Sequence, residues 1–292
     1  MNVVERIRTY SSLVALAHTV FALPFAASAV VLALAQTHAE LTVTRVVAML
    51  VCMVCARTSA MAFNRWADRD IDVRNPRTRG RHVPAGVVRP WEALALAAGS
   101  GAGFVVVATT LGAWPGILAT PVLAVLLGYS YAKRFTWGAH AWLGIALALA
   151  PGGAWIAMGC APGPGIVLLM AAVATWLLGF DILYSLQDEH FDRESNLRSI
   201  PARFGARRAL AISATAHAAT VALLAGCGLA LHRGPAFAAA VAGSAALLFY
   251  EQWLVRRRGL AAIDRAFFDV NAWVSVAFFA LVLLDGILRR TR

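Results

Sequence analysis

Long apolar runs follow one another along nearly the whole chain, and short polar segments separate them. A helix that crosses a membrane needs about 20 mostly apolar residues. This pattern predicts an all-α, polytopic membrane protein with no room for a separate soluble domain, so we treat residues 1–292 as a single transmembrane domain in the lipid bilayer. The nine expected spans are 12–35, 43–63, 91–111, 115–132, 140–159, 165–184, 208–231, 235–254 and 266–288.

Composition supports the same class. Only 14% of the residues are charged and the mean hydropathy is +0.68, whereas soluble domains carry about 25% charged residues. The net charge of +11 alone is compatible with a nucleic-acid partner, but 20 of the 26 Lys and Arg residues fall on one side if the N-terminus is cytoplasmic and nine helices alternate. Basic residues concentrate in cytoplasmic loops of membrane proteins. We therefore expect no nucleic-acid partner, although the basic C-terminal tail departs from this rule.

Eight of the fifteen acidic residues gather in two short segments. Asp68, Asp70 and Asp72 lie at the end of the second span. The second cluster lies at the end of the sixth span and consists of Asp181, Asp188, Glu189, Asp192 and Glu194. Asp68 and Asp72 repeat the spacing of Asp188 and Asp192, 120 positions later, which hints at a repeated half.

The four-residue spacing predicts polar stripes, because positions four apart lie on one face of a helix. Asn64, Asp68 and Asp72 would form one stripe, and Asp188 with Asp192 another. One interpretation is a solvated helix end paired to nearby arginines. The other is two facing carboxylate sets that hold Mg²⁺, an ion that takes oxygen ligands and shares them with substrate phosphates. Carboxylate pairs, a divalent metal and many arginines together indicate a diphosphate site.

Five segments resemble, in order, motifs of the UbiA superfamily of intramembrane prenyltransferases. The segments "NRWADRDID" and "DILYSLQDEHFD" are similar to the two aspartate-rich motifs of that family, and "YSYAKR" to its YxxxK stretch. The loops "NPRTRGRHVPAG" and "SIPARFG" resemble the segments that follow each motif. Arg65 stands where many members carry Asp. Together with "HTVFALPFA", this favours the branch that resembles 4-hydroxybenzoate polyprenyltransferases, which includes the prenyltransferase of the futalosine route to menaquinone.

The resemblance implies nine helices around a central cavity, a polyprenyl diphosphate substrate, an aromatic acceptor and Mg²⁺. Its metal ligands would be Asn64, Asp68, Asp72, Asp188 and Asp192. Phosphate charge would be neutralised by Lys133, Arg77 and Arg81, with Arg134 and Arg198 as weaker candidates, although some loop arginines serve only as topology signals. Tyr129 and Tyr184 could shield an allyl cation, because aromatic faces attract positive charge; interfacial tyrosines are the alternative interpretation. Asp181 could orient Tyr184 or help to accept a proton.

Arg57 lies inside the second span, seven residues before Asn64 and therefore on the same helical face. A charge at such a depth is costly and is usually functional. We expect it to bind the carboxylate of an aromatic acid, such as 4-hydroxybenzoate or a dihydroxynaphthoate; an internal ion pair is the alternative.

Two other functions stay open at this point. The same fold could serve a non-acid acceptor such as a lipid alcohol, a chlorophyllide or haem. From another class, a transporter could bind an anionic substrate, but transporters favour broken helices at the bilayer centre, whereas these clusters lie at helix ends. We expect an enzyme of the bacterial or archaeal cell (inner) membrane, with its active-site mouth facing the cytoplasm.

Overall fold

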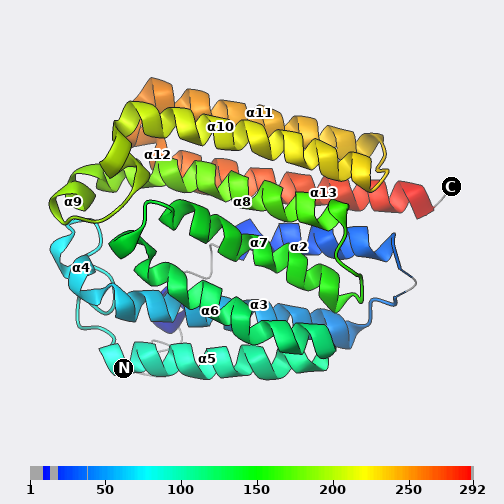
Figure 1. The fold of residues 1–292 in the computed structure, drawn as a ribbon, viewed down its shortest axis with the longest axis horizontal. Coiled ribbons are helices and arrows are strands. Elements are labelled where there is room, and N and C mark those ends of the chain that lie inside the picture. The colour runs from blue at the N-terminus through cyan, green and yellow to red at the C-terminus, as the bar shows by residue number, and fades with distance from the viewer. Residues whose placement is uncertain (1–8, 14–18, 38, 291–292) are drawn as a thin grey trace. The chain divides into compact units, whose positions relative to one another are not determined.

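Every regular element that the computed structural model describes is helical (Figure 1). The described residues are 9–13, 19–37 and 39–290. The helices are α2 (Thr19–Leu34), α3 (Val43–Ala67), α4 (Arg69–Arg74), α5 (Pro90–Thr110), α6 (Ala113–Phe135), α7 (Ala139–Ala157), α8 (Pro164–Ser185), α9 (Glu189–Glu194), α10 (Ile200–Ala230), α11 (Pro235–Arg258), α12 (Ile263–Arg265) and α13 (Asn271–Arg290). Short 3₁₀ segments η2 (Leu186–Asp188) and η3 (Gly259–Ala262) and a π-helical segment η4 (Ala266–Val270) join them.

Each of the nine predicted spans overlaps a helix of the described part of the chain. Eight helices of the described part are long and apolar enough to cross a membrane, and the apolar helix Phe21–Leu34 is shorter. The expected first span began at residue 12, but residues 14–18 lie outside the described residues. The expected seventh span began at residue 208, whereas α10 begins at Ile200 and is kinked at Gly205, whose φ of 77° favours glycine.

The chain divides into two compact units. One comprises residues 1–19 and 42–131, and the other residues 20–41 and 132–292. In the first unit α3 packs along α5, and Gly101 lets α5 approach Ser59 of α3, whose hydroxyl donates to the Ala97 carbonyl at 2.8 Å. Small residues commonly allow such close approach of helices in lipid.

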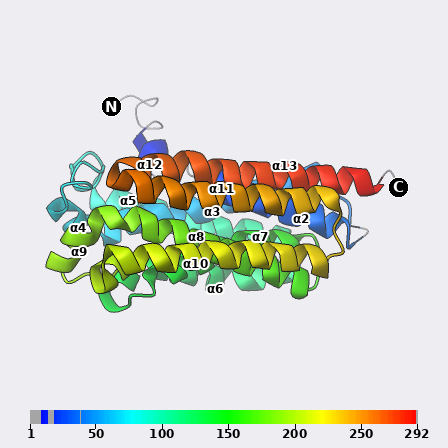
Figure 2. The ribbon, with the colours of Figure 1, turned by 90° about the horizontal axis from the view of Figure 1, so that it is seen from above.

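The second unit is built on α8, which packs against both α7 and α10, while α11 packs against α10 and α13 (Figures 1 and 2). A buried polar network links these helices. Trp176 Nε1 of α8 donates to Asn271 Oδ1 at 2.7 Å, and Asn271 Nδ2 donates to Glu251 Oε1 of α11 at 2.8 Å. Gln252 Nε2 donates to Ser213 Oγ of α10 at 2.7 Å. Asn271 thus makes the interhelical hydrogen bonds that buried polar groups require.

Candidate active site

The first acidic motif lies where α3 gives way to α4. Asp68 ends α3 and is the N-cap of α4, with φ −93° and ψ 3°. The backbone N–H of Asp68 donates to the Asn64 carbonyl at 2.9 Å, and that of Asp72 donates to the Asp68 carbonyl at 2.8 Å. The four-residue spacing of Asn64, Asp68 and Asp72 is therefore kept across a break in the helix.

The second acidic motif has the same local structure. Asp188 closes the 3₁₀ turn after α8 and is the N-cap of α9, with φ −101° and ψ 2°. Asp192 lies on α9, a helix of 6 residues like α4. Asp188 and Asp192 are 5% and 2% exposed, and Asp72 is 5% exposed. Each unit thus presents one capping aspartate followed by one buried aspartate.

The sequence predicts uninterrupted helical stripes here, and both helices are instead interrupted at the first aspartate of each motif. Carboxylates four apart repel one another on a helix, whereas anions are stabilised in the first turn of a helix, near its free N–H groups. The break starts a new short helix and places Asp72 and Asp192 in its first turn.

In the first unit, Arg81 is bound to the buried carboxylate of Asp72. Its Nη1 donates to Oδ1 at 2.9 Å and to Oδ2 at 3.0 Å. Asn64 Nδ2 donates to Asp68 Oδ2 at 2.8 Å and to Ser130 Oγ at 3.5 Å. The structure thus brings together four predicted site residues of this unit, Asn64, Asp68, Asp72 and Arg81, while Arg77 is exposed in the same loop.

The loop that carries Arg81 is anchored to the helices behind it. Val83 and Val88 pack with Ala62 of α3 and Ala93 of α5 in one buried cluster. Partial burial, together with the charge of Arg65, lowers the pKa of His82, so this imidazole is neutral at pH 7. A fixed loop holds the Arg81 guanidinium beside Asp72 at little further cost in entropy.

In the second unit, Lys133 takes the place that Arg81 has in the first. Lys133 Nζ lies 3.6 Å from Asp192 Oδ2, a buried oxygen without a hydrogen-bond partner. The backbone N–H of Arg198 donates to the Lys133 carbonyl at 2.7 Å, and the Arg198 guanidinium donates to the Phe135 carbonyl. Arg134 is exposed. The guanidinium of Arg198 also lies over the ring of Trp137, 5.7 Å from its centroid.

His140 is a site residue that the sequence analysis missed. Its Nδ1 lies 2.6 Å from Asp181 Oδ2, and the backbone N–H of Ile200 donates to its Nε2 at 3.3 Å. Because a backbone N–H can only donate, Nε2 is the accepting nitrogen and Nδ1 carries the proton that is donated to Asp181. His140 is fully buried. It therefore fixes the Asp181 carboxylate and ties α7 to α8 and to the start of α10.

We predict that His140→Ala lowers the thermal stability of the detergent-solubilised protein. Removing the imidazole leaves the Asp181 carboxylate and the Ile200 N–H without this partner, which costs about 1–3 kcal/mol for a buried polar group. The matched control is His190→Ala, because His190 also pairs with a carboxylate, that of Glu194, but its side chain is 85% exposed. Equal unfolding temperatures for the two variants would contradict the assigned role.

Arg57, Tyr129 and Tyr184 are half-buried. Arg57 and Asn64 lie on the same face of α3, and seven residues of helix separate them by about 10 Å along the axis. Tyr129 lies on α6, four residues before Lys133, and Tyr184 lies on α8, three residues after Asp181. Each of these three side chains therefore lies on the same helix as another predicted site residue and within two turns of it.

No group of three or more His, Cys, Asp and Glu side chains that could hold a metal ion occurs among the described residues. Each motif therefore offers a pair of carboxylates rather than a complete protein cage. This suits Mg²⁺, which usually keeps several waters and binds through one or two carboxylates plus substrate phosphates. The buried Asp192 Oδ2, which lacks a hydrogen-bond partner, also fits a cation.

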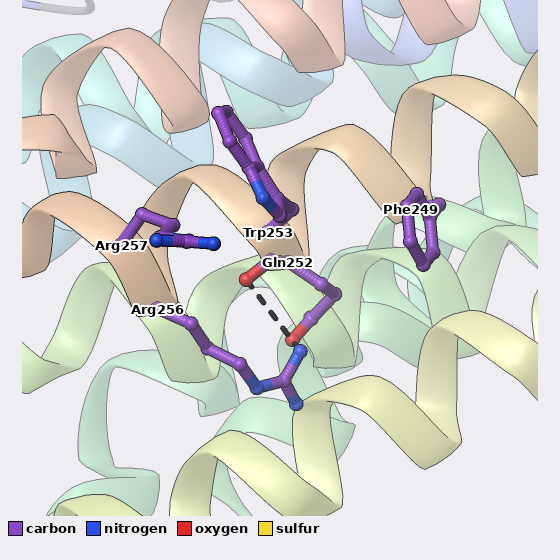
Figure 3. Close-up of a pocket in the computed structure, with 5 residues that line it drawn as sticks. All are labelled: Phe249, Gln252, Trp253, Arg256 and Arg257. Atoms are coloured by element: carbon purple, nitrogen blue, oxygen red, sulfur yellow. Dashed lines mark hydrogen bonds between the residues drawn. The ribbon is translucent and has the colours of Figure 1, made fainter.

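A pocket lies elsewhere, on α11 (Figure 3). It has a volume of about 370 Å³ and contains none of the predicted site residues, so it is distinct from both motifs.

Comparison with known proteins identifies the family. The model of the UbiA prenyltransferase family matches residues 22–282. The chain belongs to this family. It is therefore a prenyltransferase and an integral membrane protein.

Curated UbiA relatives are similar over most of the chain. The 4-hydroxybenzoate octaprenyltransferase of Aromatoleum aromaticum is 34% identical over 237 residues, which is 80% of this chain and 78% of the relative. The protein of the same name from Dechloromonas aromatica is 32% identical, with the same coverage of both chains.

Solved UbiA structures share the fold. The apo structure of a UbiA homolog from Aeropyrum pernix K1 has a TM-score of 0.82 and 33% identity, covering 94% of this chain and 98% of the other. A UbiA homolog from Archaeoglobus fulgidus, solved with GPP and Mg²⁺, has a TM-score of 0.70 at 20% identity, covering 94% of this chain and 99% of the other. The predicted all-α, UbiA-like membrane fold is confirmed.

Proposed function

We propose that this protein transfers a polyprenyl group from a polyprenyl diphosphate to a hydroxylated aromatic acid, in a reaction that depends on Mg²⁺. The acceptor class is 4-hydroxybenzoate or 1,4-dihydroxy-6-naphthoate, as in quinone biosynthesis. Two relatives are named 4-hydroxybenzoate octaprenyltransferase, and a homolog of the same fold was solved with GPP and Mg²⁺. The matched family also favours an enzyme over the transporter considered above.

The observation that carries this proposal is the repeated motif: in each unit a capping aspartate precedes a buried aspartate that is paired with a cation. We propose that the two units act as one catalytic domain. Asn64, Asp68, Asp72, Asp188 and Asp192 would hold Mg²⁺, directly or through water. Their oxygens are the ligand type that this ion prefers.

The basic residues would bind the diphosphate. Arg81 and Lys133 lie beside Asp72 and Asp192. When a diphosphate binds with its metal, each of these two basic side chains would turn from its carboxylate partner to a phosphate oxygen. Arg77, Arg134 and Arg198 would add positive charge at the rim. Arginine binds phosphate through its planar fork, and lysine binds it as a point charge.

Mg²⁺, when bound, neutralises the charge that develops on the departing pyrophosphate. The aromatic faces of Tyr129 and Tyr184 would stabilise the allyl cation that remains on the prenyl chain, while the apolar spans exclude water from it. The acceptor ring then forms a carbon–carbon bond and loses a proton. Asp181, whose carboxylate is oriented by His140, is our candidate to accept that proton.

Arg57 would bind the acceptor carboxylate. It lies on the same face of α3 as Asn64, at the greater depth where a charge is usually functional. The rise of about 10 Å along the helix between Arg57 and Asn64 would leave room for an aromatic ring between the acid-binding residue and the first motif. A bound carboxylate would also compensate the cost of placing an arginine in the span.

Membranes that contain the protein test the proposal when they are supplied with a polyprenyl diphosphate, each acceptor in turn, and Mg²⁺ or EDTA. We expect a prenylated aromatic acid, detected by mass spectrometry together with pyrophosphate release, and no product in EDTA. Product from a lipid alcohol, a chlorophyllide or haem, with none from either aromatic acid, would overturn the acceptor assignment. Inside-out and right-side-out vesicles would test whether the mouth faces the cytoplasm of a bacterial or archaeal cell, because prenyl diphosphates do not cross the bilayer freely.

A further inference from the structure

The pocket on α11 is formed by one face of that helix. Its lining residues are spaced three and four apart, so they share one stripe on the helix surface. Figure 3 shows their side chains gathered along α11. The lining residues are Phe249, Gln252, Trp253, Arg256 and Arg257.

The stripe changes from aromatic to basic along the helix. Phe249 and Trp253 are 75% and 45% exposed, and the Trp253 ring stacks on Tyr250 with 5.9 Å between centroids. Arg256 and Arg257 follow, and the helix ends at Gly259, where φ is 62°. Aromatic residues concentrate at the level of lipid headgroups, and basic residues lie just beyond them. The pocket therefore crosses the boundary between hydrocarbon and headgroups.

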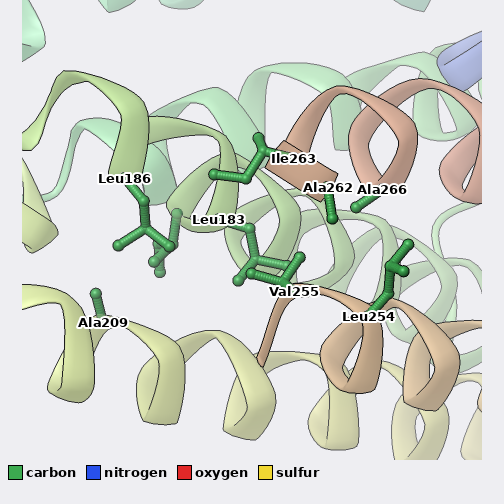
Figure 4. Packing of buried hydrophobic residues seen from close by; sticks show 9 residues of the cluster. Leu183, Leu186, Ala209, Leu254, Val255, Ala262, Ile263 and Ala266 are labelled. Carbon is green, nitrogen blue, oxygen red and sulfur yellow. The ribbon is translucent and has the colours of Figure 1, made fainter. Parts of the chain in front are cut away.

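The membrane face to which this pocket belongs is the one that carries the second acidic motif. Leu183 and Leu186 of the α8 end pack with Ala209 of α10 and with Leu254 and Val255 of α11 in one buried cluster (Figure 4). Asp188 follows Leu186 within the same turn. The pocket and this motif thus lie at the same end of the second unit.

Among the residues that the structure describes, the positive charge of the pocket has no acidic counterpart. No salt bridge to Arg256 or Arg257 occurs among the described residues, and neighbouring Glu251 is fully buried and bonded to Asn271. Arg256 Nη1 donates to the Gln252 carbonyl at 3.5 Å, and its Nη2 donates to the Leu210 carbonyl of α10 at 3.3 Å. A guanidinium has five N–H donors, so the head is fixed between two helices while three donors remain to bind an anion.

We propose that this pocket binds the headgroup phosphate of an anionic phospholipid, with an acyl chain lying along Phe249. The arginine fork matches phosphate oxygens, an aromatic ring such as that of Trp253 favours the level of the headgroups, and basic residues just beyond a membrane span attract anionic lipids. The site is separate from the prenyl diphosphate site, because no carboxylate lines it to hold a metal ion. The inference is independent of the proposed aromatic acceptor.

Lipid titration of the full-length protein in detergent tests the proposal. We expect phosphatidylglycerol to raise the unfolding temperature and to remain bound in native mass spectrometry, and phosphatidylcholine to do neither. The Arg256→Gln/Arg257→Gln double variant should bind phosphatidylglycerol about 10- to 30-fold more weakly, since each arginine that lines the pocket would lose its charge-assisted hydrogen bonds to the phosphate. Arg258→Gln is the matched control, because Arg258 belongs to the same basic triplet but does not line the pocket; its affinity should stay within about twofold of native.

Equal binding of phosphatidylglycerol by the double variant and the native protein would overturn the proposal. So would equal protection by inorganic phosphate, because the bound anion would then not need to belong to a lipid. If the double variant does not fold, brominated lipids decide the question with the native protein. Brominated phosphatidylglycerol should quench a fluorescence component that Trp253→Phe removes; equal quenching of that component by brominated phosphatidylcholine would show that no anionic headgroup is selected.

Discussion

Asp188→Ala and Asp68→Ala should each reduce prenyl transfer by about 100- to 1000-fold, because a Mg²⁺ ion that stabilises the leaving group contributes several kcal/mol to the transition state. The measurement is the initial rate of product formation at saturating polyprenyl diphosphate, repeated over a range of Mg²⁺ concentrations. Pyrophosphate release should fall in parallel, since the ionisation step itself is affected. The unfolding temperature should change little, because neither side chain makes a capping hydrogen bond to the short helix that follows it.

Asp70→Ala is the matched control for this result. Asp70 stands between the two aspartates of the first motif, yet its side chain is 80% exposed and pairs only with Arg69 in the described contacts. Its removal should leave the rate within about twofold of native, as expected for a surface ion pair. If Asp188→Ala or Asp68→Ala retained the activity of Asp70→Ala, the repeated motif would not be the metal site.

Arg57→Ala should abolish most transfer to aromatic acids while the ionisation of the diphosphate is preserved. Truncating one partner of a desolvated charge pair costs about 2–4 kcal/mol, which is about 30- to 1000-fold in kcat/KM for the acid. A neutral analogue such as 4-hydroxybenzamide distinguishes recognition of the carboxylate charge from recognition of the ring. The variant should lose its preference for the acid over the amide, and we would measure both substrates in the same membranes.

Arg45→Ala serves as the control here, since Arg45 lies on the first turn of the same helix, twelve residues before Arg57. It should keep the native preference for the acid. An Arg57→Ala variant whose rates with acid and amide fall by the same factor would show that the guanidinium does not recognise the carboxylate.

Hydropathy was sufficient to locate the membrane helices, because a span must satisfy its own backbone and face lipid along about 20 residues. The ends of the helices were less predictable. The second expected span ended at residue 63, whereas α3 continues to Ala67 and α4 follows. Polar residues such as Asn64 and Arg65 end a hydropathy window, but they do not end a helix whose backbone bonds continue.

The motif residues could be identified from spacing, whereas their immediate partners could not. The family resemblance singled out Arg77 and Arg81 among the seven arginines between residues 65 and 89, but only the fold of the loop shows that Arg81 is the one that reaches Asp72. His140 was missed for the same reason, since its contact with Asp181 joins positions 41 residues apart on two helices. The sequence offered one indication of His140, namely that it is a polar residue at the start of an apolar span.

The buried bond between Glu251 and Asn271 has a consequence for how the protein enters the membrane during synthesis. A carboxyl group within a span is costly to expose to hydrocarbon, and the partner of Glu251 is synthesised 20 residues later, at the start of α13. The cost of exposing Glu251 to lipid is therefore avoided if helix α11 stays beside the insertion machinery until α13 has emerged from the ribosome. The two would then be released into lipid as a hairpin, with their polar groups already covered.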